Sequence, residues 1–169
     1  MLPGDELGPA DLVATRAIDI DAPPSAVWPW LVQMGQGRGG FYSYDALENL
    51  VGLGIHSAER IEPQWQGLAV GDPVHLADEV TLTAVTVEPD HALVLQGDVP
   101  VDDDDPAPAT FVWAFVVEPR GDSGSRLLVR ERYSYELGWA RRMVPPITWL
   151  SFVMTERMMR GIRERAERR

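Results

Sequence analysis

The sequence predicts an α+β fold in which a curved antiparallel β-sheet wraps around one long C-terminal helix. Three observations predict it: the order of strand, two short helices, a run of strands and a final helix; an apolar period of two from Leu68 onward; and an apolar stripe at helical spacing after Pro145-Pro146. Strands and helices do not alternate, as a parallel sheet would require. Wrapping the sheet around the helix is the simplest way to bury that stripe, and such an arrangement commonly leaves a cavity between the two.

The first elements are a strand and two short helices. Residues Leu12 to Ile20 alternate loosely and predict the strand. Ala22-Pro23-Pro24-Ser25 opens the first helix, because proline at the first helical positions loses no hydrogen bond, whereas Pro29 is expected to limit or kink it. Ser43 is a candidate N-cap for the second helix, Tyr44 to Leu50.

The remaining elements are antiparallel strands and the terminal helix. Runs with a period of two, separated by turn residues, predict strands over Asp72–Leu76, Val80–Glu88, Ala92–Gln96, Thr110–Glu118 and Ser125–Leu137. We predict the helix at roughly Ile147 to Glu167, with an apolar stripe of Ile147, Leu150, Met154, Met158 and Ile162.

Length and composition are those of one globular domain. We expect a single domain over residues 1–169, with residues 1–11 as a flexible N-terminal tail. The chain has no cysteine, which excludes disulfides, thiolate metal ligands and a cysteine nucleophile. Met1-Leu2-Pro3-Gly4-Asp5-Glu6 lacks the basic start and apolar run of a secretory signal, so we expect a cytoplasmic protein.

Charge, the length of the apolar runs and the spacing of the acids argue against nucleic-acid binding, membrane insertion and a calcium loop. The net charge is -11, with 20 acids and 4 arginines in residues 1–120 and 6 acids and 11 arginines in residues 121–169. Nucleic acid is therefore not expected as a partner. The longest apolar run, Met143 to Met154, is too short to insert stably across a bilayer. The acids Asp102 to Asp105 lack the spacing of a calcium loop, and we interpret them as a solvated turn.

Several motifs resemble those of a known superfamily. The strand ending in Ile18-Asp19-Ile20-Asp21-Ala22-Pro23-Pro24, the helix Ser25-Ala26-Val27-Trp28-Pro29-Trp30-Leu31, the strands and the terminal helix resemble the SRPBCC superfamily over nearly the whole chain. That group includes START lipid-binding domains, aromatic polyketide cyclases and pollen-allergen proteins, all with the helix-grip fold. The segments Gly39 to Asp45 and Ile55 to Ile61 are similar to one bacterial subgroup in particular. The resemblance implies this fold and a cavity for a small hydrophobic ligand, but no activity, no cofactor and no universal catalytic residue.

Glu131 is the main candidate for chemistry. Alternation along the last strand places Glu131 and Tyr133 on the face that carries Leu127 and Val129, which we expect to point inward. Burial favours the neutral form of a carboxyl unless a cation or a hydrogen-bond donor meets it. Glu131 could act as a general acid or base, or orient a polar group of a ligand. The alternatives are a structural ion pair, or a register shifted by one residue that places Glu131 in water.

The histidines do not indicate a metal site. His56, His75 and His91 are spaced too irregularly for a metal motif, and no cysteine is available to complete one. His56 lies near the expected mouth of the cavity and is a third catalytic candidate beside Glu131 and Tyr133. The alternative is that it caps a strand.

Aromatic residues and methionines are candidates to contact a ligand. Tyr42 and Tyr44 could hydrogen-bond a ligand at the entrance, or the segment could be pinned by ion pairs of Arg38 or Arg60 instead. The candidates to line the interior are Trp65, Phe111, Trp113, Phe115, Met154 and Met158. The alternative for each is plain core packing, and the facing of Phe111 to Phe115 is ambiguous because both faces of that strand are apolar.

Three functional hypotheses follow from the sequence. The first is a carrier, sensor or accessory protein that binds a small hydrophobic molecule of lipid, polyketide or aromatic type. The second is an enzyme of the cyclase, dehydratase or isomerase type without a metal, acting on such a molecule through Glu131. The third is a protein whose arginine-rich end, Arg157 to Arg169, meets an acidic partner or an anionic membrane surface. The sequence identifies neither the ligand nor a protein partner.

Overall fold

The structure of the protein is a computed structural model that describes residues 1–43, 57–77, 80–99, 109–134 and 140–168, with side chains of the terminal helix described from Phe152 onward. The strands are β1 (Leu12–Ile20), β2 (Pro73–Ala77), β3 (Val80–Glu88), β4 (Ala92–Val99), β5 (Ala109–Arg120) and β6 (Gly124–Ser134). The helices are α1 (Pro24–Val32) and α3 (Ala140–Ala166), and short 3₁₀ turns are η1 (Asp5–Leu7) and η2 (Pro63–Trp65).

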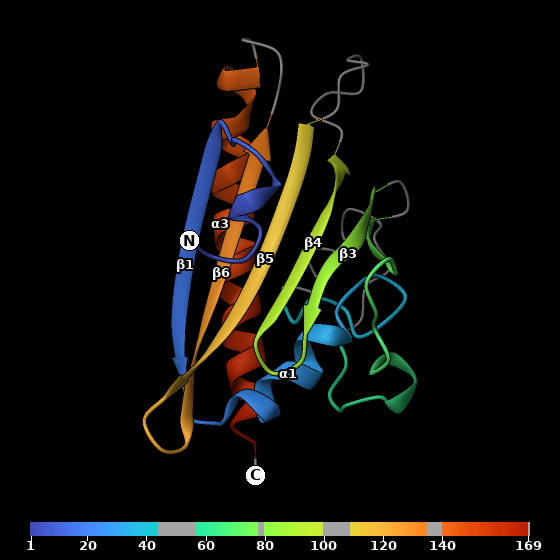
Figure 1. The fold of residues 1–169 in the computed structure, drawn as a ribbon, viewed down its shortest axis with the longest axis vertical. Coiled ribbons are helices and arrows are strands. Elements are labelled where there is room, and N and C mark those ends of the chain that lie inside the picture. The colour runs from blue at the N-terminus through green and yellow to red at the C-terminus, as the bar shows by residue number, and fades with distance from the viewer. Residues whose placement is uncertain (44–56, 78–79, 100–108, 135–139, 169) are drawn as a thin grey trace.

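The strands form one six-stranded sheet in the order β1-β6-β5-β4-β3-β2, and each neighbouring pair is antiparallel. The first and last strands of the chain are therefore neighbours, with Leu12 opposite Tyr133 and Ile20 opposite Ser125. α3 lies along one face of the sheet, behind β1 and β6 in Figure 1, and α1 contacts both α3 and β5. This arrangement is the helix-grip fold, as the sequence predicted.

The sheet has an inner face, turned toward α3, and an outer face. On β5 the aromatic residues Phe111, Trp113 and Phe115 belong to the main core, whereas Val112 and Ala114 pack with Val94 in a small separate cluster. This alternation resolves the facing that the sequence left ambiguous. Met158, Met159 and Ile162 of α3 complete the main core against the inner face.

Proline lies inside both helices. Pro29 is within α1, which ends three residues later at Val32, so the prediction that this proline limits the helix agrees with its length. The prediction that the terminal helix begins after Pro145-Pro146 is wrong, because α3 already begins at Ala140. Pro145 and Pro146 each remove one backbone donor, but neither prevents the turn of α3 that precedes them. The second short helix, predicted at Tyr44 to Leu50, lies outside the described residues.

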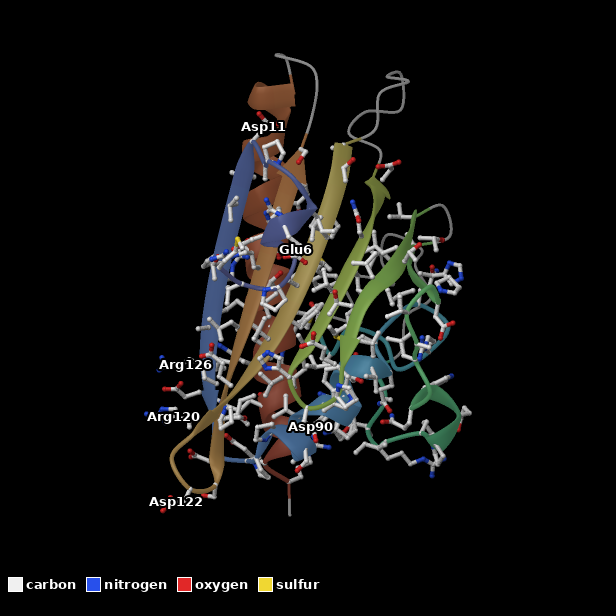
Figure 2. All side chains as sticks on the ribbon, viewed as in Figure 1. Glu6, Asp11, Asp90, Arg120, Asp122 and Arg126 are labelled. Atoms are coloured by element: carbon white, nitrogen blue, oxygen red, sulfur yellow. The ribbon has the colours of Figure 1, made fainter. Side chains whose placement is uncertain are left out.

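Residues 1–11 lie across the outer face of the sheet, on the side opposite α3 (Figure 1), and Glu6 of this segment projects in front of the strands (Figure 2). A Cβ on Gly4 would lie 3.2 Å from Val94 Cγ1, so the backbone there packs directly onto the sheet. Arg130 Nη1 donates to both carboxylate oxygens of Asp5, at 2.8 and 2.7 Å. The Arg132 guanidinium donates to the carbonyls of Gly4 and Gly8 and is buried by the segment.

Charged side chains also gather at the hairpin between β5 and β6. Figure 2 shows Arg120, Asp122 and Arg126 there. Arg126 Nε lies 2.7 Å and Arg120 Nε lies 3.4 Å from the carboxylate of Asp19 on β1. Such exposed pairs contribute little to stability. In the described part of the chain, no helix is long and apolar enough to cross a membrane.

The carboxyl group of Asp5 makes attachment of the N-terminal segment pH-dependent. Burial by itself would raise the pKa of Asp5, but hydrogen bonds from Arg130 and the Leu2 amide, with the charges of Arg130 and Arg132, outweigh it and lower the pKa below the ordinary value. A lowered pKa stabilises the fold above the unfolded-state pKa of about 3.9, and this contribution is lost as pH falls through the folded-state pKa. In urea unfolding at pH 7, Asp5→Asn is expected to be less stable than the parent by about 1 kcal/mol or less.

That difference should shrink as the pH falls from about 4 through the lowered folded-state pKa of Asp5, where the parent carboxyl becomes protonated. Asp122→Asn, at an exposed position in the β5–β6 turn, is the matched control and should follow the parent. A stability difference for Asp5→Asn that stays constant from pH 7 to pH 2.5 would contradict the attachment.

Candidate functional site

Glu131 lies on the inner face, on β6. On β6 it is paired with Ala14 of β1 on one side and Trp113 of β5 on the other, and it is 1% exposed. Its Oε1 accepts a hydrogen bond of 2.5 Å from Thr155 Oγ1 of α3 and lies 3.3 Å from Nη1 of Arg16. Glu131 thus faces inward as predicted, and a register that would place it in water is excluded.

Arg16 reaches this position because of the register between β1 and β6. It is paired with Val129, two positions from the Ala14–Glu131 pair, so Arg16 and Glu131 are diagonal neighbours on one face. The Arg16 side chain is 11% exposed, and its Cζ lies 4.8 Å from the centroid of the Phe152 ring. Sequence reasoning missed Arg16, although it is the one charged residue among the alternate, otherwise apolar positions of β1.

Three buried donors at the inner face have no hydrogen-bond partner among the described residues: Arg16 Nε, Arg16 Nη1 and Trp113 Nε1. The 3.3 Å separation of Arg16 Nη1 and Glu131 Oε1 is close enough for an ion pair, but its angles are not those of a hydrogen bond. The attraction between these two groups is therefore coulombic. A buried donor without an acceptor costs about 1–3 kcal/mol, so these groups favour any acceptor placed beside them.

Aromatic rings surround this polar cluster. Phe111 stacks on Tyr133 with centroids 4.7 Å apart, and Trp113 lies 4.8 Å from Phe115 and 6.2 Å from Phe41. The inner face thus brings together the predicted residues Phe111, Trp113, Phe115, Glu131 and Tyr133. Phe111 and Tyr133 meet because they are directly opposite in the β5–β6 ladder.

Tyr42 is held by contacts within the protein. It has a positive φ of 57° and is 1% exposed. Its hydroxyl donates to the Trp30 carbonyl at 3.0 Å, and its amide donates to Ser57 Oγ at 2.9 Å. Burial raises the pKa of the Tyr42 phenol far above its ordinary value, although a hydrogen bond with Gln33 opposes this. Tyr42 therefore anchors the segment that crosses α3.

Polar side chains fasten the rest of this segment. Gln33 is fully buried; its Nε2 donates to the Arg60 carbonyl at 3.2 Å and its Oε1 accepts from the Glu62 amide at 3.0 Å. Arg38 Nη2 donates to the carbonyls of Val32 and Trp65 at 2.9 and 3.0 Å, and burial lowers the pKa of Arg38. The segment is thus pinned mainly by bonds to backbone groups.

The other predicted site residues lie in η2, on α3 or outside the described part of the chain. Trp65 is half-buried in η2, and Met158 is buried in the main core. Met154 is half-buried, and its carbonyl accepts a hydrogen bond from Ser43 Oγ at 3.3 Å. Tyr44 and His56 lie outside the described residues.

The two described histidines are on the surface. His75 Nδ1 lies 2.8 Å from Thr81 Oγ1, and His91 Nε2 lies 3.8 Å from Glu88. Within the described ranges, no group of three or more His, Cys, Asp or Glu side chains is placed to hold a metal ion.

Arg157, Arg160, Arg165 and Arg168 of α3 have acidic partners. Arg157 pairs with Glu164 at 3.0 Å and Arg160 with Glu156 at 2.7 Å. The Glu59 carboxylate forms ion pairs with Arg165 Nη2 at 2.5 Å and with Arg168 Nη1 at 2.6 Å. The hydrogen bond from Arg168, against a smaller effect of burial and with the charges of both arginines, lowers the pKa of Glu59. These pairs reduce the positive field of the helix end.

Comparisons with known proteins identify the fold. No family profile matches the chain, and no curated protein matches its sequence. Among solved structures, protein CV1439 from Chromobacterium violaceum is 10% identical with a TM-score of 0.56, and the alignment covers 93% of this chain and 98% of that one. Norcoclaurine synthase from Thalictrum flavum is 14% identical with a TM-score of 0.55, covering 90% of this chain and 84% of that one.

A third structure, protein MLL2253 from Mesorhizobium loti, is 18% identical with a TM-score of 0.51, covering 90% of this chain and 96% of that one. At these identities the likeness extends to the fold and not to the site residues.

The crossing of Tyr42 over α3 requires glycine at position 161. A Cβ on Gly161 would lie 2.2 Å from the Tyr42 carbonyl oxygen and 2.8 Å from Tyr42 Cβ. Gly161→Ala is therefore expected to lower the free energy of unfolding by about 1–3 kcal/mol, although alanine is the better helix former. Gly67→Ala is the control, because a Cβ there meets nothing within 4 Å. Equal or higher stability of Gly161→Ala in urea unfolding would contradict this crossing.

Arg16 and Glu131 are expected to depend on each other for stability. Arg16→Met removes the cation and leaves a buried carboxylate, which should cost about 3–5 kcal/mol at pH 7. The double variant Arg16→Met/Glu131→Leu leaves no unpaired charge and should recover most of that loss. Chemical unfolding of the two variants and the parent measures this. Parent-like stability of the single variant would show that the two groups are not paired.

Proposed function

Because this protein has the helix-grip fold of the SRPBCC superfamily, we propose that it binds a small hydrophobic molecule between the inner face of the sheet and α3. The molecule is of lipid, polyketide or aromatic type, and the protein acts as a carrier, sensor or accessory factor. The observation that carries the proposal is the buried cluster of Arg16, Glu131 and Thr155 within an aromatic inner face. A core that served packing alone would gain nothing from buried charges.

The aromatic residues supply the apolar contacts that such a ligand needs. Burying roughly 300 Å² of apolar ligand surface contributes about 7 kcal/mol at ~25 cal/mol/Å², against association costs of at least about 4 kcal/mol. Apolar contact alone therefore gives modest affinity. The donors of Arg16 and Trp113 can add the polar contacts that raise affinity and fix the orientation of the ligand.

A catalytic role for the same site is the second candidate. Norcoclaurine synthase, one of the proteins of similar fold, is an enzyme by name. A buried carboxyl near aromatic rings suits acid or base chemistry, and Tyr133 lies two residues from Glu131 on the same face. However, Thr155 donates to Glu131 and Arg16 lies beside it, which suits a carboxylate that accepts and orients. We therefore place binding before catalysis.

The third hypothesis, a surface function of the arginine-rich helix end, has less support. Arg157, Arg160, Arg165 and Arg168 each have an acidic partner on the protein. Paired arginines attract an anionic surface less than free ones do. We expect no salt-sensitive sedimentation with anionic vesicles.

Native mass spectrometry of the freshly purified protein, followed by organic extraction, tests ligand binding. We expect a defined co-purifying mass, or a rise in melting temperature with at least one member of a panel of fatty acids, aromatic polyketides and quinones, because a ligand that binds only the folded state stabilises it. A Glu131→Gln variant that keeps this stabilisation would separate binding from turnover. An empty protein that no member of the panel stabilises would overturn the proposal.

A further inference from the structure

The chemistry around Glu131 specifies more than an apolar ligand. We propose that the site selects an uncharged molecule with a hydrogen-bond-accepting oxygen, such as an aromatic ketone, over the hydrocarbon and over the carboxylate of the same shape. This inference rests on the proposed binding function and names the class of ligand that the same site takes.

The first step concerns the donors. Arg16 Nε, Arg16 Nη1 and Trp113 Nε1 are buried and have no hydrogen-bond partner among the described residues. Guanidinium and indole nitrogens donate hydrogen bonds and do not accept them. A ligand that satisfies them must therefore bring an acceptor. A hydrocarbon of the same shape leaves the donors as they are and gains only the apolar contact.

The second step concerns charge. Nη1 of Arg16 already lies 3.3 Å from Glu131 Oε1, so the buried guanidinium described in this cluster already faces a buried carboxylate. A ligand carboxylate would place a second anion beside Glu131 and would lose its hydration without gaining a second cation. A carbonyl oxygen accepts the same hydrogen bonds with no net charge. The charge balance thus disfavours an acid and favours a ketone.

The third step concerns shape. Trp113 is paired with Glu131 in the β5–β6 ladder and Arg16 is the diagonal neighbour of Glu131 on β1, so the residues that carry the donors lie on the two strands beside Glu131. The Phe111–Tyr133 stack and Phe115 lie on the same face. A planar ring packs against such rings while its carbonyl meets the donors. An aromatic ketone fits both requirements.

Three naphthalene probes of nearly equal shape separate these effects: 2-acetylnaphthalene, its alkene isostere 2-isopropenylnaphthalene, and 2-naphthoate. Isothermal titration calorimetry of the full chain at pH 7 measures their dissociation constants. We expect the ketone to bind at least about tenfold more tightly than either of the other two, as one satisfied buried hydrogen bond implies.

Two variants assign the selectivity to these residues. Trp113→Phe keeps an aromatic side chain, though a smaller one, and removes the Nε1 donor, and it should reduce the ketone-to-alkene ratio severalfold. Arg16→Met/Glu131→Leu removes both charges and the Arg16 donors; its ketone-to-alkene ratio should also fall severalfold, keeping only the contribution of Trp113 Nε1, and its discrimination against naphthoate by charge repulsion should weaken. Trp28→Phe, on α1 outside the cluster, is the matched control and should keep the parent ratio. Circular dichroism melts confirm that each variant is folded.

The outcomes separate this inference from the proposed function. Equal binding of the ketone and the alkene would overturn the donor argument while leaving a binding site in place. Tightest binding of naphthoate would overturn the charge argument. No binding of any of the three probes would count against this inference and against the proposed function together. A ketone preference that survives both site variants would show that other residues produce it.

Discussion

The buried contact of Glu131 with Arg16 and Thr155 is the constraint on which the interior depends. A carboxylate that is 1% exposed on β6 needs a cation and a donor, and these come from β1 and α3. The contact therefore joins the first strand, the last strand and the last helix. Replacing such a buried pair by apolar residues is often neutral or stabilising. The pair therefore matters for where it places polar groups, more than for the stability of the fold. It fixes where polar chemistry can occur on a face that is otherwise apolar and aromatic.

A second close contact, between Tyr42 and Gly161, fixes the chain segment that follows α1. The chain after α1 crosses α3 with Tyr42 against Gly161, where a side chain at position 161 has no room. The Tyr42 hydroxyl then bonds to Trp30, and Gln33 and Arg38 bond to neighbouring backbone groups. Among the described residues, the polar groups of this crossing hold the fold together. The inner face of β1, β5 and β6 is left as the place where polar groups can meet a ligand.

Much of the fold follows from the sequence, because the period of two, the turn residues and the terminal apolar stripe are local signals. Alternation counted from Leu127 also predicted the inward facing of Glu131, and the observed register and burial exclude the alternative of a shift by one residue. Arg16 could not be assigned in the same way. A single arginine in a loosely alternating strand at the edge of a sheet is usually solvated, and only the register with β6 brings it to Glu131. The role of Tyr42 likewise depends on an approach to Gly161 from more than a hundred residues away in the chain.

The arginines on the two faces of the sheet differ in how many of their hydrogen-bond donors have an acceptor within the protein. On the outer face, Arg130 and Arg132 donate to Asp5 and to the carbonyls of Gly4 and Gly8, so their donors serve the N-terminal segment. At the helix end, Arg165 donates to Ala58, Gly161 and Glu59. Arg16 is as deeply placed as these residues, yet two of its nitrogens lack an acceptor among the described residues. Arg38 also keeps one buried nitrogen, Nε, without an acceptor among the described residues, but its Nη2 donates to two carbonyls. The donors without acceptors on the aromatic inner face are those of Arg16 and Trp113. The cost of removing these donors from water is already part of the folding free energy. A ligand that supplies the acceptor therefore gains hydrogen bonds without adding that cost.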